Sequence, residues 1–453
     1  MAVGLGVVLL SLAIYTVSNH DRRNFYNHFV WQASAWLEGQ AAIRYPVVGQ
    51  DGSPGNDYFQ DVLPVEGADG TPTGRGLIPF PPLPAVLLVP FVALWGLTTN
   101  AQLIATVVGA IDVGLAFWML GRLPVRPAVR VACTVFLGFG TVFWYAAELG
   151  STWYFAHVVA VGLTLLAIGI ALDADTAASR SDAGASRSDA GASRSDDGTE
   201  ATGGRTAGVL DGRQFAAGFL LGLAATSRLT LLLGAPFLVL VGGGGTWLRR
   251  SVSAGLGASL PVLALLAYNV ASTGHIFHPG YDYLYHLEAG FYTFLDYKPD
   301  WGIEDPRYLP QNFAIMFLRP PDILPACDPP AARGIFDAAC PFVVPNPIGM
   351  SLLLTSPGWL LALPSVRWLR RDRIVAGAVI AVVLIAAVNL MHFSQGWVQF
   401  GYRFSSDFAP FAIVLVALVM ERWRALWRPG LALIGLSIAV NAWGVAWGNI
   451  LGW

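Results

Sequence analysis

Apolar runs of about 15 to 20 residues recur along the whole sequence, and each is long enough to cross the hydrocarbon core of a bilayer as a helix. Hydrophobic residues make up 55% of the 453 residues and charged residues only 12%. A soluble globular chain has about 25% charged residues. The low charge excludes a disordered chain, a nucleic-acid-binding protein and an ordinary soluble enzyme. The pattern predicts an all-α polytopic membrane protein.

About eleven segments are predicted to span the membrane. The first covers residues 3–17 and is expected to stay uncleaved, because neither a basic stretch nor a small-residue cleavage site accompanies it. The other ten lie at about 101–120, 127–146, 153–172, 214–227, 229–247, 252–271, 347–364, 374–392, 406–420 and 429–448.

A further apolar run at 83–96 is too short to cross the membrane. At 1.5 Å per residue its length is about 21 Å, against a hydrocarbon core of about 30 Å. If it does not cross, the four short arginine-rich loops share one side, as the positive-inside rule requires of cytoplasmic loops. Those loops hold Arg122, Arg126 and Arg130; Arg249 and Arg250; Arg367, Arg370, Arg371 and Arg373; and Arg422, Arg424 and Arg428. We therefore predict a juxtamembrane or re-entrant helix on the outer side and a cytoplasmic N-terminus.

This threading divides the chain into two membrane modules and a linker. They are an N-terminal module at 1–172 with a first outer loop at 19–100, a cytoplasmic linker at 173–213, and a C-terminal module at 214–453 with a second outer loop at 272–347. The linker holds a seven-residue ASRSDAG repeat without an apolar seam, which excludes a coiled coil. Its composition is typical of a flexible solvated segment.

The cysteines agree with this threading. Cys327 and Cys340 both lie in the second outer loop, where an oxidising compartment permits a disulfide. Cys133 lies within a predicted span, where we expect a buried apolar residue. No cysteine or histidine spacing predicts a metal site, so no cofactor is required, although the acidic first outer loop would suit a divalent cation.

The ionisable residues gather at the outer membrane boundary. Only Asp112 lies in the middle of a predicted span, where either a hydrogen bond to a neighbouring helix or a proton or ion site would explain it. Arg228 and Arg403 each end a predicted span on the outer side, and a guanidinium matches phosphate in shape and charge. One such arginine also fits an interfacial anchor. Two on one face favour a shared anionic ligand.

Four segments together resemble a known family. They are NFYNHFVWQASAWLEGQ (24–40), FPPLPAVLLVPFVALWG (80–96), GLAATSR (222–228) and GYRFSSDFAP (401–410). In this order and spacing they resemble the GT-C-type integral membrane glycosyltransferases, in the broad group of bacterial protein-mannosyltransferase-like and aminoarabinose-transferase-like enzymes. The resemblance covers most of the chain.

The resemblance implies a reaction at the extracytoplasmic face of the bacterial plasma membrane. A hexose or pentose would pass with inversion from a polyprenyl-phosphate donor to a glycan, lipid or protein acceptor. An aspartate early in the first outer loop would serve as general base. Basic residues would neutralise the departing phosphate, and we expect Arg228 and Arg403 in that role.

The chain departs from the family at the base. The position that matches the family's aspartate is Asn24, and an amide cannot accept the proton. Asp61 and Asp21 are equal candidates for the base, followed by Asp57. His28 could also accept a proton near neutral pH. The residues expected to contact the substrates are His28, Glu148, His157, Tyr281 and Tyr402.

Two other functions stay open from the sequence. A transporter or lipid flippase would show two repeated halves and polar residues at the membrane midplane, whereas we find no such repeat and only Asp112 at depth. A non-catalytic membrane scaffold is favoured by Asn24 alone. We expect the lipid bilayer as a partner and no nucleic acid.

Overall fold

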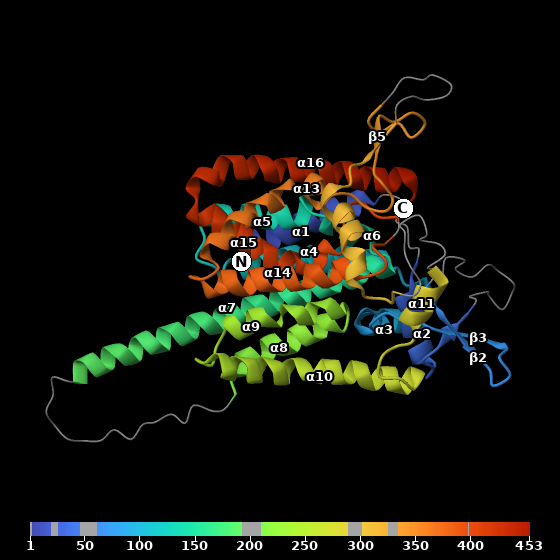
Figure 1. The fold of residues 1–453 in the computed structure, drawn as a ribbon, viewed down its shortest axis with the longest axis horizontal. Helices are drawn as coiled ribbons and strands as arrows, with labels where there is room; N and C mark the ends of the chain where they lie inside the picture. The colour runs from blue at the N-terminus through green and yellow to red at the C-terminus, as the bar shows by residue number, and fades with distance from the viewer. Residues whose placement is uncertain are drawn as a thin grey trace.

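The protein is a bundle of helices that lie side by side, with irregular segments gathered at one end (Figure 1). The computed structural model describes residues 2–19, 26–45, 61–192, 210–288, 301–324, 334–396 and 398–453. The helices of the bundle are α1 (Ala2–Ser18), α4 (Ala101–Leu120), α5 (Pro127–Phe139), α6 (Phe143–Leu149), α7 (Thr152–Ala192), α8 (Gly212–Ala225), α9 (Ala235–Leu240), α10 (Trp247–Thr273), α13 (Leu352–Thr355), α14 (Arg373–Met391), α15 (Ser405–Arg422) and α16 (Trp427–Leu451).

Five helices in the described part of the chain are long and apolar enough to cross a membrane, or six if the bent pair α5 and α6 counts as one span. The expected number of eleven is therefore not confirmed. Proline and glycine explain two of the interrupted segments, because they disfavour a continuous helix. The segment expected at 229–247 contains a 3-10 helix, Leu229–Gly234, and then α9, which ends before a run of four glycines. The segment expected at 347–364 contains α13 and a 3-10 helix, Pro357–Trp368.

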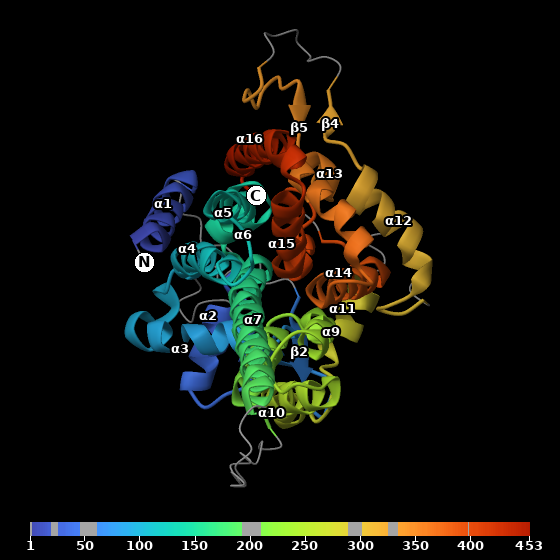
Figure 2. The same ribbon diagram turned by 90° about the vertical axis from the view of Figure 1, so that its left-hand side faces the viewer.

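The core of the bundle contains α7 and α15. In the end-on view α7 lies between α4 and α9 (Figure 2). Every residue of α15 from Ser405 to Met420 is buried. A helix that is apolar on all sides belongs in such an interior position. One of the few charged residues of α15, Asp407, is therefore enclosed by protein.

Helix α7 extends into the segment that is predicted as a linker, 173–213. Helix α7 continues to Ala192, beyond the end of the main bundle (Figure 1). Alanine and arginine are good helix formers and are frequent in the repeat, so the backbone extends the preceding helix. Residues 193–209 lie outside the described residues.

The two predicted outer loops contribute short elements at one end of the bundle (Figure 1). In the first loop, α2 (His28–Leu37) and α3 (Leu83–Trp95) are helical, and α3 covers most of the segment 83–96 that was predicted to be a helix. Between them, β1 (Ile43–Arg44), β2 (Leu63–Glu66) and β3 (Pro72–Leu77) form an antiparallel sheet in the order β1-β3-β2. The second loop contains α11 (Gly280–Glu288), α12 (Leu309–Phe313), a π-helical turn (Ala314–Leu318) and the pair β4 (Asp322–Ile323) and β5 (Val343–Val344); its 3-10 turn is Pro306–Tyr308.

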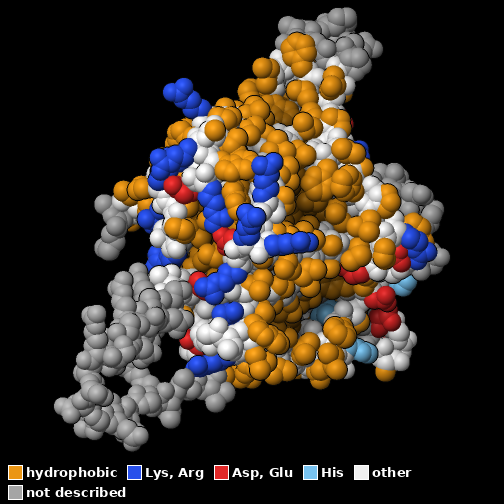
Figure 3. All heavy atoms as spheres, turned by 60° about the vertical axis from the view of Figure 1, so that its left-hand side comes forward, with side chains coloured by type: hydrophobic (Ala, Val, Ile, Leu, Met, Phe, Trp, Pro, Cys, Tyr) orange, Lys and Arg blue, Asp and Glu red, His pale blue; other side chains and the backbone are white. Residues whose placement is uncertain are grey.

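The arginine-rich loops meet at the opposite end of the bundle, where basic side chains cover much of the surface (Figure 3). Ion pairs connect these loops to neighbouring helices. Arg122 contacts Asp173 at 3.2 Å, Arg126 contacts Glu421 at 3.0 Å and Arg373 contacts Asp175 at 3.0 Å; Arg422 contacts Asp372. The basic loops are therefore grouped at one end of the bundle, as the sequence predicted.

Helices α4 and α7 approach closely because α7 has glycine at the contact. A side chain at Gly162 would collide with the carboxylate of Asp112, and one at Gly169 would collide with Trp118. Small residues permit this kind of close packing between membrane helices. Asp112 is buried, and one of its carboxylate oxygens has no hydrogen-bond partner among the described residues. Among the described residues no neighbouring helix donates a hydrogen bond to that oxygen, which was one of the two explanations offered for Asp112.

We expect Gly162→Val to destabilise the protein by about 1 to 3 kcal/mol, because the added atoms force α4 and α7 apart. Thermal unfolding in detergent measures this effect. Gly255→Val is the matched control, since the space around Gly255 in α10 is open. Equal unfolding temperatures for the two variants would contradict the close α4–α7 contact.

Candidate functional site

The start of α7 brings together residues that are far apart in the sequence. Gly150 ends α6 with a positive φ of 56°, which turns the chain sharply so that α7 begins at Thr152. The first two turns of α7 carry Trp153, Tyr154 and His157. Each of these side chains contacts a different part of the outer end of the bundle.

His157 contacts the buried carboxylate of Asp407, at the start of α15. The ring Nδ1 lies 2.8 Å from Asp407 Oδ1, and both side chains are almost completely buried. A carboxylate accepts hydrogen bonds, so Nδ1 carries the proton of this pair. The other ring nitrogen, Nε2, is also buried and has no hydrogen-bond partner among the described residues.

Asp407 is also the partner of Arg228. The guanidinium donates from Nε to Oδ1 at 3.2 Å and from Nη2 to Oδ2 at 3.0 Å. Thr230 Oγ1 donates to the same carboxylate at 2.9 Å and Asn389 Nδ2 at 3.4 Å. Burial on its own lowers the pKa of Arg228, but the Asp407 carboxylate more than offsets this, so the pKa is raised. The positive charge of Arg228 is therefore already balanced within the protein.

Arg403 is the second predicted phosphate ligand, and its surroundings differ. Its residue is only 9% exposed, and Nε has no hydrogen-bond partner among the described residues. No carboxylate within the described ranges forms an ion pair with it. The guanidinium lies 5.6 Å from the ring of Tyr154 and 5.3 Å from the ring of Phe404. Gly396, with a φ of +89°, makes room for it, because a side chain there would meet the guanidinium.

The ring of Phe404 is the centre of this arrangement. Arg228 lies 5.0 Å from it, Arg403 5.3 Å, His157 5.9 Å and His392 6.4 Å. We call these residues, together with Asp407, the Phe404 cluster. Arg228, Arg403 and His157 were predicted site residues, and the structure brings them together. Within the described ranges, the positive charge of Arg228 is paired with the Asp407 carboxylate, whereas that of Arg403 is not paired with a carboxylate.

Asp61 connects the first outer loop to the same region. Trp153 Nε1 donates a hydrogen bond to Asp61 Oδ2 at 2.8 Å, and Asp61 has a positive φ of 58°, which few residues other than glycine adopt. Tyr281 of α11 experiences the charges of both Asp61 and Arg228. Loss of water around its hydroxyl raises the pKa of Tyr281 to about 12, Asp61 and Glu304 add to this, and Arg228 opposes it.

The other predicted contact residues are buried around the cluster. His28 is fully buried, and its Nδ1 lies 3.1 Å from Thr152 Oγ1. Tyr402 is also buried and donates to Gln395 Oε1 at 2.7 Å. Glu148 is buried at the end of α6, and its carboxylate is a charged neighbour of Tyr154. The described hydrogen bonds of His28 and Tyr402 are therefore with other residues of the protein, Thr152 and Gln395.

Several predicted residues cannot be placed. Asp21, Asp57 and Asn24 lie outside the described residues. Cys327 does too, whereas Cys340 is buried, so the Cys327–Cys340 disulfide stays a prediction. In the described part of the chain, no three His, Cys, Asp or Glu side chains are grouped so that they could hold a metal ion.

Two features of the site were missed by the sequence analysis. Asp407 lies one turn after Arg403 inside a predicted span, and a carboxylate in an apolar run is a signal that could have identified it. The second feature is a close pair between His392 Nδ1 and Glu304 Oε1, 2.7 Å apart. These two residues are 88 positions apart, and no spacing in the sequence indicates that they meet.

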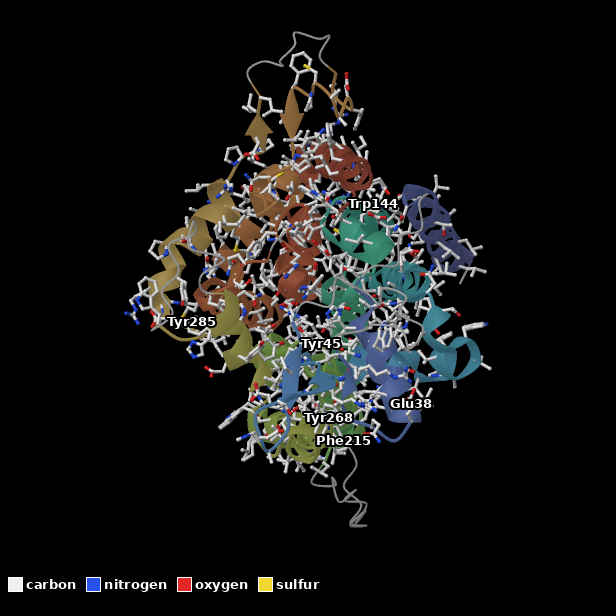
Figure 4. The ribbon with its side chains drawn as sticks, turned by 90° about the vertical axis from the view of Figure 1, so that its right-hand side faces the viewer. Glu38, Tyr45, Trp144, Phe215, Tyr268 and Tyr285 are labelled. Atoms are coloured by element: carbon white, nitrogen blue, oxygen red, sulfur yellow. The ribbon has the colours of Figure 1, made fainter. Side chains whose placement is uncertain are left out.

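An apolar pocket of about 560 Å³ lies beside the cluster, between α2, α3, α8 and α10. Its walls include Trp36, Leu83, Val86, Thr226, Leu265 and Tyr268. Trp36 packs edge-on against Tyr268 with ring centroids 5.7 Å apart. Figure 4 looks onto this end of the molecule and labels Tyr268 of α10 and Tyr285 of α11. Thr226, on the wall of the pocket, is two residues before Arg228 in the chain.

No protein-family model and no curated protein matches this chain. Among solved structures, the chain is similar to the crystal structure of ArnT from Cupriavidus metallidurans bound to undecaprenyl phosphate. The match covers 99% of this chain and 77% of that chain, with 12% sequence identity and a TM-score of 0.49.

Proposed function

We propose that this protein is a membrane glycosyltransferase of the GT-C type that uses a polyprenyl-phosphate sugar donor. The acceptor, a glycan, lipid or protein, would be modified at the extracytoplasmic face of the bacterial plasma membrane, with the arginine-rich end in the cytoplasm. This face corresponds to the end of the bundle that carries α2, α3 and α11.

Arg403 is the observation that carries the proposal. A buried guanidinium without a counter-charge is costly, because its desolvation is not repaid by an ion pair. A phosphate that binds beside it supplies the missing charge and matches its donors in shape. Arg228 differs, because Asp407 already balances its charge. We therefore assign the donor phosphate to Arg403 and give Arg228 a supporting place in the same cluster.

The apolar pocket supports a lipid-linked donor. It adjoins the end of α8, and its volume lies within the range of about 300 to 1,000 Å³ that is common for small-molecule sites. Part of an isoprenoid chain would bury apolar surface there while its phosphate reaches the charged cluster. The backbone N–H of Leu83 donates to Thr226 O at 3.1 Å, which joins the proline-rich helix α3 to the α8 end of the pocket.

Sugar transfer follows from this placement. The acceptor hydroxyl attacks the anomeric carbon from the side opposite the phosphate, so the configuration at that carbon inverts. The leaving polyprenyl phosphate develops negative charge, which a preorganised guanidinium stabilises. The hydroxyl also loses a proton to a general base, and Asp61 is one candidate for that base in the described part of the first outer loop.

The test is transfer by the purified protein in nanodiscs, with polyprenyl-phosphate sugars labelled in the sugar and a panel of lipid and glycan acceptors. We expect labelled product, and saturable binding of the unlabelled polyprenyl phosphate. A chain that neither binds the donor nor forms product would refute the proposal. Counterflow of substrate across proteoliposomes without sugar transfer would favour a transporter in its place.

A further inference from the structure

His392 and Glu304 form a pair that the proposed reaction has not used. His392 follows α14 directly, and its Nδ1 lies 2.7 Å from Glu304 Oε1. Because an ionised carboxylate only accepts hydrogen bonds, the Nδ1 atom carries the proton and Nε2 keeps its lone pair. Hydrogen bonds of the ring involve only Nδ1 among the described residues. The imidazole is thereby held in the tautomer that can accept a proton at Nε2.

The backbone around the pair is fixed by several hydrogen bonds. Phe393 N–H donates to Ile303 O at 2.9 Å, and Asp305 N–H donates to Met391 O at 2.9 Å. Asn312 Nδ2 donates to His392 O, also at 2.9 Å. The second outer loop is therefore attached to the end of α14 at the point where the pair forms.

Tyr285 of α11 supports the same segment. Its hydroxyl accepts hydrogen bonds from the backbone N–H groups of Trp301 and Gly302, at 3.1 and 3.0 Å. Its ring packs edge-on against Phe393, with centroids 5.2 Å apart. Tyr285 lies at the outer end of the molecule (Figure 4). A base has to be positioned in this way to act efficiently on a bound hydroxyl.

The pair lies in the same charged region as the proposed phosphate site. The His392 ring contacts Phe404, against which Arg228, Arg403 and His157 also lie. The charge of Glu304, like that of Asp61, raises the pKa of Tyr281, and the charge of Arg228 opposes this. Asp305, which follows Glu304 in the same loop segment, is also charged and forms an ion pair with Arg307.

Exposure distinguishes His392 from the other histidines of the region. His157 is 1% exposed and His28 is fully buried, so neither can receive a proton from an acceptor molecule without a rearrangement. The His392 side chain is 22% exposed and Glu304 46%. The His392 side chain is thus partly accessible to solvent, while Glu304 fixes its Nδ1 by a hydrogen bond.

We propose that His392 is the general base of the reaction and that Glu304 is its positioning residue. This inference rests on the proposed glycosyl transfer. The proton of the acceptor hydroxyl passes to Nε2 as the oxygen bonds to the anomeric carbon. The bond from that carbon to the phosphate oxygen breaks, and its electron pair leaves with the polyprenyl phosphate beside Arg403. The imidazolium is stabilised by Glu304 and later returns its proton to water.

This assignment explains how a chain with Asn24 at the family's aspartate position can still transfer sugar. An imidazole is more basic than a carboxylate by about 2 pKa units in model compounds, which makes it the better proton acceptor near neutral pH. Trp153 donates a hydrogen bond to Asp61 Oδ2 at 2.8 Å, so one oxygen of that carboxylate already has a partner within the protein. Asp61 then orients Trp153 at the start of α7.

The test compares His392→Gln, Glu304→Gln and Asp61→Asn across pH 5 to 8, with His275→Gln, at an exposed histidine of the second outer loop, as the control. We expect His392→Gln to lose about a hundredfold or more in kcat and to abolish the fall in rate at low pH. Glu304→Gln should lower kcat with little change in KM, because it removes the carboxylate that positions the His392 ring. Asp61→Asn should keep the fall.

Chemical rescue separates a catalytic role from a structural one. We expect added imidazole to restore part of the turnover of His392→Gly, because the ring position is open to solvent. Wild-type turnover by His392→Gln, or a loss confined to Asp61→Asn, would overturn the assignment while leaving glycosyl transfer intact. Absence of product from the wild-type protein would overturn both. Thermal unfolding of every variant establishes that it is folded.

Discussion

Replacing Arg403 with alanine is expected to lower kcat/KM for the polyprenyl-phosphate donor by about 100- to 1,000-fold, which is the usual effect of removing one preorganised donor from a developing anion. The fold should survive, because the Arg403 guanidinium has no carboxylate partner in the described residues, so its loss leaves no buried charge unpaired. Initial rates at low and saturating donor concentrations, with direct binding of polyprenyl phosphate, measure the effect.

Two further variants make the Arg403 result specific. Arg403→Lys keeps the charge but loses the planar arrangement of donors, so we expect partial activity. Arg44→Ala removes a half-exposed arginine of the first outer loop, and we expect normal transfer from it. A folded Arg403→Ala protein with unchanged turnover would exclude Arg403 as the phosphate ligand, and the proposed function would lose its main support.

Replacing Asp407 with alanine is expected to destabilise the protein by about 3 to 5 kcal/mol, the range found when one partner of a buried ion pair is removed. Asp407 accepts hydrogen bonds from His157, Arg228, Thr230 and Asn389, which come from separate parts of the bundle. Its removal leaves the Arg228 guanidinium partly buried without a counter-charge. The unfolding temperature in detergent should fall sharply.

A double variant tests the cause of that loss. In Asp407→Ala with Arg228→Met, neither charge remains, so we expect stability to recover in part relative to Asp407→Ala alone. A double variant that is less stable by the sum of the two single effects would show that the residues act independently. That outcome would contradict the buried ion pair as the link between α15 and the end of α8.

Much of the helical framework could be predicted from the sequence. The spans expected at 101–120 and 374–392 match α4 and α14 to within one or two residues, because a long apolar run has few alternatives to a helix in a membrane. Apolarity could not indicate where a helix breaks. Helices α5 and α6 meet at an angle of 53°, although the sequence between them reads as one continuous apolar span.

The candidate site was predicted in part. Arg228, Arg403, His157 and Tyr281 were identified, since charged or aromatic groups at the ends of apolar runs have few structural reasons to be there. Their partners were not identified. The Arg228–Asp407 pair joins residues 179 positions apart, and the choice of which arginine is neutralised decides which one can bind a phosphate.

By itself, the sequence determined that this chain enters a membrane as helices, and that its basic loops and its polar outer segments lie at opposite ends. These follow from the hydrophobic effect and from the cost of unpaired charge, which act locally and can be read from short windows. Only the tertiary structure decided that Asp407 balances Arg228, that Arg403 has no carboxylate partner among the described residues, and that Glu304 holds His392. Those relations depend on distances between helices, which short-range sequence patterns do not specify.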